Sequence, residues 1–84
     1  MKVYHWTSKA NAEQILRSGL RQWSFVCKNR DDWYGEVCLA VDLPYDIDWD
    51  NRDEHAMWQA IVQETIEPSR IHVIVQVFTE PLST

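Results

Sequence analysis

The sequence predicts one α+β domain, with one main helix packed on a small mixed or antiparallel sheet. A single amphipathic helical pattern occupies residues 9–18. Segments with β propensity lie on both sides of it, with the clearest at residues 36–42 and 71–78. The 84 residues are enough for one hydrophobic core, so we treat residues 1–84 as a single domain.

The first two elements are a strand and the main helix. Residues 2–6 are aromatic and β-prone, which predicts a strand. Thr7 and Ser8 follow as candidate helix N-caps, since a hydroxyl there accepts a bond from an unpaired backbone N–H. The helix is expected over residues 9–18, with its apolar side chains at i, i+3 and i+4 spacing. These are Ala12, Ile15 and Leu16.

Gly19 is placed to end this helix. A glycine at that position adopts the left-handed conformation at no steric cost, and Leu20 after it can fold back onto the last turn. Beyond it, residues 23–27 are compatible with a short strand and residues 28–32 with a loop. Residues 36–42 predict a mostly buried strand.

The second half begins after Pro44, which ends the preceding strand. Residues 45–54 have the composition of an acidic loop, and residues 55–58 fit a single helical turn. An extended pattern covers residues 60–66, and residues 67–70 indicate a turn or one 3₁₀ turn. The β-branched run at 71–78 predicts a long strand.

Charge and composition restrict the function classes. The net charge is −5, and residues 43–84 hold two basic and eight acidic side chains, a balance that disfavours general nucleic-acid binding. No apolar run is long enough to span a membrane. We expect a cytoplasmic chain with reduced thiols at Cys27 and Cys38 and no metal site. Five Trp residues imply that large rings fill the core or line a binding surface. We also expect self-association, because so small a chain is not expected to bury all its aromatic rings alone.

His5 and Thr7 form the first candidate binding pair. They are two residues apart, so an extended backbone directs both to one side, just before the helix N-terminus. That pair can hold ribose hydroxyls or an anionic oxygen. The alternative is that Thr7 is only a helix cap and His5 a half-buried strand residue.

Residues 3–20, VYHWTSKANAEQILRSGL, resemble the opening of the ADP-ribosyltransferase-like superfamily. Members of that superfamily often begin with a strand ending in Tyr-His-x-Thr. A helix with an Asn-Ala-x-x-Ile-Leu core and a terminal Gly-Leu follows. Residues 66–74, IEPSRIHVI, more weakly resemble a strand–turn–strand element near the end of such domains. The resemblance implies a minimal fold of this type with NAD or an NAD-derived nucleotide as ligand.

The resemblance also assigns roles to individual residues. His5 would contact a ribose hydroxyl, with Thr7 and Ser8 as accompanying positions. Trp6 lies within the same motif. Tyr34 or Trp33 would stack on the nicotinamide, although both also fit as core or rim rings beside a turn glycine.

Two charged residues complete the candidate set. Glu64, on the segment 60–66, is the candidate catalytic carboxylate of an active transferase, although a strand Glu is more often solvated. Arg30 is a candidate phosphate ligand, and its alternative is an ordinary surface residue.

Three functions follow as hypotheses. The first is a small domain that binds an NAD-derived or other nucleotide and sequesters it, as phage counter-defence proteins do with nucleotide signals. The second is an enzyme that transfers ADP-ribose from NAD with Glu64 as its catalytic residue. The third is an interaction module whose exposed aromatic rings meet a protein partner, with the acidic segment 46–54 making a charged contact. The short chain favours binding over catalysis, because catalytic members of the superfamily are usually longer.

Overall fold

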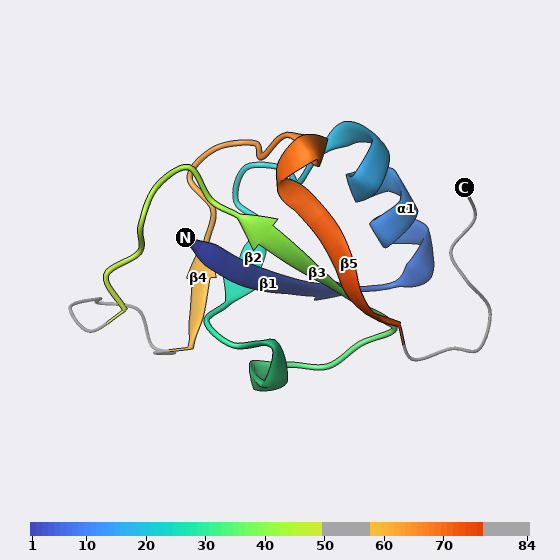
Figure 1. Cartoon of the computed structure of the whole chain (residues 1–84), viewed down its shortest axis with the longest axis horizontal. Helices are drawn as coiled ribbons and strands as arrows, with labels where there is room; N and C mark the ends of the chain where they lie inside the picture. Colours follow the sequence, from blue (N-terminus) through green and yellow to red (C-terminus); the bar gives the residue numbers. More distant parts are fainter. Residues whose placement is uncertain (50–57, 77–84) are drawn as a thin grey trace.

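The computed structural model describes residues 1–49 and 58–76, which form five strands, one α-helix and two 3₁₀ turns (Figure 1). In chain order these are β1 (Lys2–Thr7), α1 (Lys9–Ser18), β2 (Phe25–Cys27), η1 (Arg30–Asp32), β3 (Val37–Asp42), β4 (Gln59–Ile61), η2 (Pro68–Arg70) and β5 (Ile71–Gln76). The predicted α+β class is confirmed.

The strands form one open antiparallel sheet in the order β4-β2-β1-β3-β5. The mixed-sheet alternative is wrong, because every strand pair of the described sheet is antiparallel. β1 and β3 pair along their full lengths, from Lys2 opposite Asp42 to Thr7 opposite Val37. In the view of Figure 1 the strands lie between α1 and η1.

The helix has the predicted bounds. Ser8, rather than Thr7, is its N-cap, and the Ser8 hydroxyl accepts a bond of 3.2 Å from the backbone N–H of Asn11. Gly19 ends the helix, and its N–H donates to the carbonyl oxygen of Ile15 at 2.7 Å. Its φ of 95° is positive as predicted, but its ψ of 169° places it in an extended region open essentially to glycine alone.

That extended backbone at Gly19 lets the chain pair with a distant segment. Leu20 and Ile66 form an antiparallel bridge, with N–H to carbonyl bonds of 2.9 and 2.8 Å in the two directions. Both side chains are buried in the core. The helix end is therefore fixed to the segment that precedes η2.

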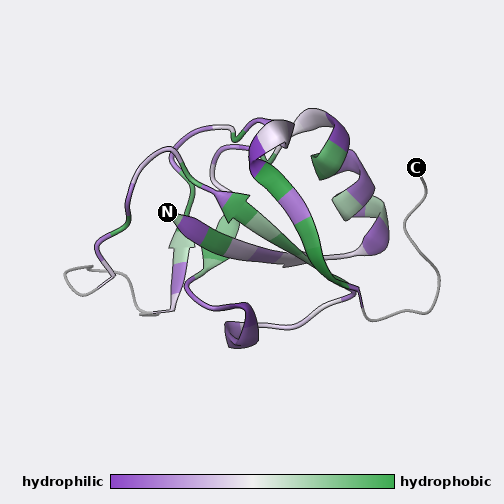
Figure 2. Ribbon diagram, viewed as in Figure 1, coloured by the Kyte–Doolittle hydropathy of each residue, from purple (hydrophilic) through white to green (hydrophobic). Residues whose placement is uncertain are grey.

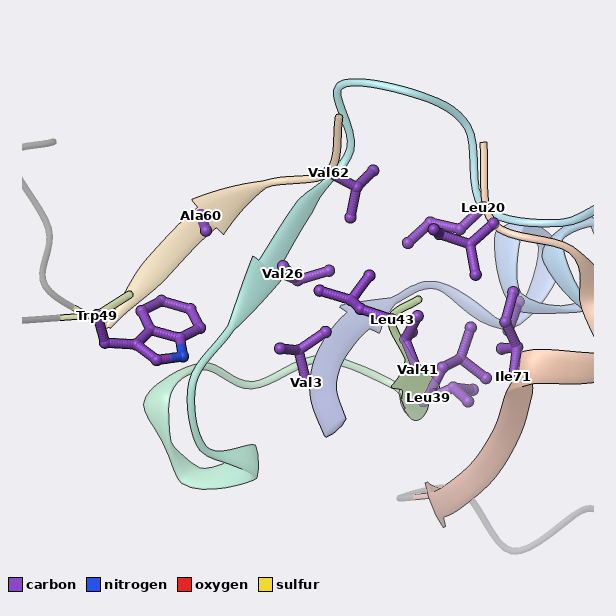
Figure 3. Packing of buried hydrophobic residues seen from close by; sticks show 13 residues of the cluster. Val3, Leu20, Val26, Leu39, Val41, Leu43, Trp49, Ala60, Val62 and Ile71 are labelled. Atoms are coloured by element: carbon purple, nitrogen blue, oxygen red, sulfur yellow. The ribbon is translucent and has the colours of Figure 1, made fainter. Parts of the chain in front are cut away.

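The core lies between α1 and the face of the sheet that the helix covers. β3 is buried along Val37–Val41, and Figure 2 shows it as a mainly hydrophobic strand, whereas η1 is hydrophilic. Ala12 brings α1 onto this core, and Ile15 and Leu16 pack against its edge. In Figure 3 the indole of Trp49 lies at the end of the cluster, near Ala60.

Two predicted strands are shorter in the structure. β2 begins at Phe25 because residues 22–23 form a turn, in which Trp23 has a φ of 74°. β4 ends at Ile61, so the predicted strand over 60–66 is wrong after that residue. Beyond it the N–H of Gln63 donates to the Tyr45 hydroxyl at 2.8 Å instead of to a neighbouring strand.

Residues 45–49, at the start of the predicted acidic loop, contribute apolar side chains to the core. Trp49 is buried, Tyr45 and Ile47 pack against the core, and Asp46 and Asp48 between them are exposed. The rest of the predicted acidic loop, most of the predicted turn at 55–58 and residues 77–78 of the last strand lie outside the described residues. In the part of the chain that the structure describes, no helix is long and apolar enough to cross a membrane.

Candidate functional site

His5 and Thr7 lie on the face of the sheet that α1 covers. His5 pairs with Leu39 and Thr7 with Val37, and residues directly opposite each other in a sheet point to the same face. Leu39 and Val37 belong to the core beneath the helix. The expectation that His5 and Thr7 share one side is therefore confirmed.

Both residues line a hollow of about 380 Å³ beside the helix. We call it the polar hollow, and it is lined by His5, Thr7, Asn11, Gln14, Ile15, Ser18, Gly19, Leu20, Arg21 and Ser24. Its helical wall consists of Asn11, Gln14 and Ser18, at the i, i+3 and i+7 positions that share one helix face. Its volume lies within the usual range for small-molecule sites, about 300–1,000 Å³.

The polar groups of this hollow are available to a ligand. Six of its side chains form no hydrogen bond or ion pair with any described residue, namely Thr7, Asn11, Gln14, Ser18, Arg21 and Ser24. The described lining contains no carboxylate, and Arg21 gives it a positive charge. The hollow therefore suits a polar, anionic group.

His5 differs from these residues because one of its ring nitrogens is engaged. Its Nδ1 lies 2.6 Å from the carbonyl oxygen of Phe25. A carbonyl only accepts, so the neutral ring carries its proton on Nδ1 and keeps Nε2 as an acceptor. Burial lowers the pKa of His5, and the backbone bond to Phe25 only partly opposes this.

A second hollow of about 360 Å³ shares the lining residues His5 and Ser24 with the first. We call it the aromatic hollow, and it is lined by His5, Trp6, Ser24, Phe25, Cys27, Trp33 and Gln59. The Trp6 indole is fixed by a bond of 2.7 Å from its Nε1 to the carbonyl oxygen of Arg30. That bond ties the η1 segment to β1, which keeps Trp6 and Trp33 at one site.

Trp33 belongs to two stacked pairs. Its ring centroid lies 5.8 Å from that of Tyr34 and 5.7 Å from that of Trp58, with interplanar angles of 17° and 18°. Tyr34 itself is 82% exposed, whereas Trp33 is 50% exposed. Of the two rings predicted to stack on a base, Trp33 lines the aromatic hollow and Tyr34 extends outward from it.

Three other predicted residues lie apart from the two hollows. Ser8 is occupied as the helix cap. Arg30 is exposed and pairs with Asp31 at 3.8 Å. Glu64 is exposed in the bend after β4 and lines a separate hollow with Thr65 and Arg70, so its predicted position on a strand is wrong.

Sequence reasoning missed most of the polar lining. Arg21 and Ser24 are in the loop after the helix, where no spacing rule indicated a shared site. Asn11, Gln14 and Ser18 form the polar stripe that any surface helix has, and only the open space beside them gives that stripe a role. Within the described ranges, no group of three or more His, Cys, Asp or Glu side chains could hold a metal ion.

No family model, curated protein or solved structure matches this chain.

Proposed function

We propose that this domain binds a nucleotide, of the NAD-derived class that the sequence resemblance implies, across the polar and aromatic hollows. The observation that carries the proposal is that one hollow is rich in unpaired polar groups, the other is aromatic, and both are lined by His5 and Ser24. A nucleotide has the same division, since a planar base is joined through ribose to charged phosphate.

The polar hollow suits the ribose and phosphate part. Arg21 supplies a guanidinium, which binds phosphate oxygens in a bidentate manner. Asn11, Gln14 and Ser18 present amide and hydroxyl groups that can both donate and accept. With no carboxylate in the described lining, a phosphate meets no like charge there.

The aromatic hollow suits the base. Trp6, Phe25 and Trp33 are the rings that line it, and stacking on aromatic rings is tolerant of base identity. His5 lies at the junction, where its Nε2 can accept a bond from a ribose hydroxyl while the ring is neutral.

Binding without turnover is the form of the proposal that the site favours. Glu64, the candidate catalytic residue, lines a different hollow from His5. The described linings of the two proposed hollows hold no other carboxylate to take that role. The domain would then sequester its ligand, as phage counter-defence proteins do with nucleotide signals.

Calorimetric titration with ADP-ribose, AMP and adenosine tests this proposal. Arg21→Gln should weaken binding of the two phosphorylated ligands by about 10- to 100-fold, the loss of a charge-assisted hydrogen bond, and should leave adenosine nearly unaffected. Arg17→Gln is the matched control, because Arg17 is exposed on helix α1 and does not line the hollow. Equal losses in the two variants, or no heat from any of the three ligands, would refute the proposal.

A further inference from the structure

The stacked rings of Tyr34, Trp33 and Trp58 form a second recognition surface outside the two hollows. We call these three rings the aromatic ladder. Its two pairs are close to parallel, at 17° and 18°, and Tyr34 is the most exposed member, at 82%. Tyr34 does not line the aromatic hollow described above. The ladder therefore offers open ring surface on the outside of the domain.

Acidic residues flank the aromatic ladder in the sequence. One of them, Glu36, accepts from the N–H of Lys9 at 3.3 Å. Asp31 and Asp32 precede Trp33 directly, and Glu36 follows two residues after Tyr34. The Asp31 side chain is 93% exposed and is partly balanced by Arg30 at 3.8 Å. One oxygen of Asp32 accepts from the N–H of Asn29 at 2.8 Å, and its other oxygen forms no bond with a described residue. Residues 30–36 hold three acidic side chains and one basic side chain.

We propose that the aromatic ladder and its flanking carboxylates dock an arginine side chain of a partner polypeptide. A guanidinium is planar, so it can continue the stack on the Tyr34 ring while its N–H groups reach a carboxylate. The negative net charge of the chain favours approach of a cationic segment and opposes a phosphate backbone.

The aromatic ladder and the polar hollow suit ligands of opposite charge. The polar hollow holds Arg21 and suits an anion, whereas the rings of the ladder have acidic neighbours in the sequence and suit a cation. Trp33 is the residue common to the ladder and the aromatic hollow. An arginine-bearing partner at the ladder would therefore lie next to, and not within, the proposed ligand site.

The test is an NMR titration of the ¹⁵N-labelled domain with a short Gly-Arg repeat peptide and with the same peptide carrying citrulline. Citrulline keeps the shape of arginine and removes its charge. We expect the arginine peptide to move the indole signals of Trp33 and Trp58 and the citrulline peptide to leave them in place. Equal binding of the citrulline peptide, or of a Gly-Lys peptide that lacks the planar group, would overturn the proposal.

Two variants separate stacking from general charge attraction. Tyr34→Leu keeps every charge and should weaken the arginine peptide about two- to fivefold, as loss of an exposed cation–π contact predicts. Trp23→Leu is the control, because Trp23 is 61% exposed and lies outside the ladder. If Trp23→Leu weakens the peptide as much as Tyr34→Leu, the ladder is not the docking site.

Discussion

The ring of His5 donates its Nδ1 proton to the backbone carbonyl of Phe25, 2.6 Å away, and so joins the middle of β1 to the start of β2. The bond fixes which nitrogen of the neutral ring is an acceptor. Because His5 lines both hollows, this contact fixes the hydrogen-bonding character of a residue that the two hollows share.

The free energy of unfolding should decrease as the pH is lowered, because of His5. Burial lowers its folded-state pKa below the ordinary value of 6.5, so the unfolded chain takes up a proton first as the pH falls. The contribution of His5 is thus fully present above about pH 6.5 and is lost as the pH falls toward the folded pKa. Urea unfolding at about pH 7.5 and about pH 5.5 measures it. We expect His5→Gln to lose less stability between the two values than the unchanged domain; equal losses in the two proteins would contradict this account.

Gly19→Ala should destabilise the domain by at least about 2 kcal/mol. The positive φ of 95° with extended ψ is strained for any side chain, and an added Cβ would meet the carbonyl oxygen of Ile66. That carbonyl also accepts the Leu20 N–H, so it cannot shift without weakening the bridge. Chemical denaturation measures the change. Ser18→Ala, one residue earlier on an exposed helical position, should cost less than about 0.5 kcal/mol.

Cys27 and Cys38 should be unreactive while the domain is folded. Both are buried free thiols, and burial raises the pKa of each to about 11. A thiol reagent at about pH 8 should label neither in the native domain and both in denaturant. Labelling of either cysteine at the same rate in the two conditions would show that it is not protected by the fold.

The parts of the fold that sequence predicts best are those with local causes. Helix α1 has its predicted bounds because Ser8 and Gly19 mark its ends by backbone chemistry within one turn of the chain. β3 was equally clear, since a strand buried on both faces is a continuous apolar run.

The errors have non-local causes. The predicted strand over 60–66 fails because pairing with the segment around β2 stops after Val62, and the N–H of Gln63 bonds to a tyrosine hydroxyl from another segment. The segment 45–49 alternates apolar and acidic residues, and this alternation indicates that one side of the segment is buried. Composition alone, which is acidic, predicts an exposed loop instead. Trp49 is buried there as a consequence.

The candidate site was predicted in part. The pairing of His5 with Thr7 follows from strand periodicity, and both line the polar hollow. Strand periodicity does not predict that Arg21 belongs to this site. Its position in the lining of the hollow that His5 also lines depends on the path of the loop that follows Gly19. The position of Glu64 depends on the same kind of loop geometry.

NAD should remain intact in the presence of the domain. The candidate carboxylate Glu64 and the proposed ligand site line different hollows, so we expect no release of nicotinamide above the buffer rate. Chromatographic separation of nicotinamide from NAD after prolonged incubation measures this. Release that disappears in Glu64→Gln and persists in Glu67→Gln would show instead that the domain is a transferase or hydrolase.

The most direct test of nucleotide binding is an NMR titration of the labelled domain with ADP-ribose. We predict that the shifted signals belong to His5, Thr7, Gln14, Arg21 and Ser24, with the Trp6 and Trp33 indoles also affected. Signals of Glu64 and Thr65, on the separate hollow, should stay in place. Shifts confined to Glu64 and Thr65, or no shifts at millimolar ADP-ribose, would contradict the account.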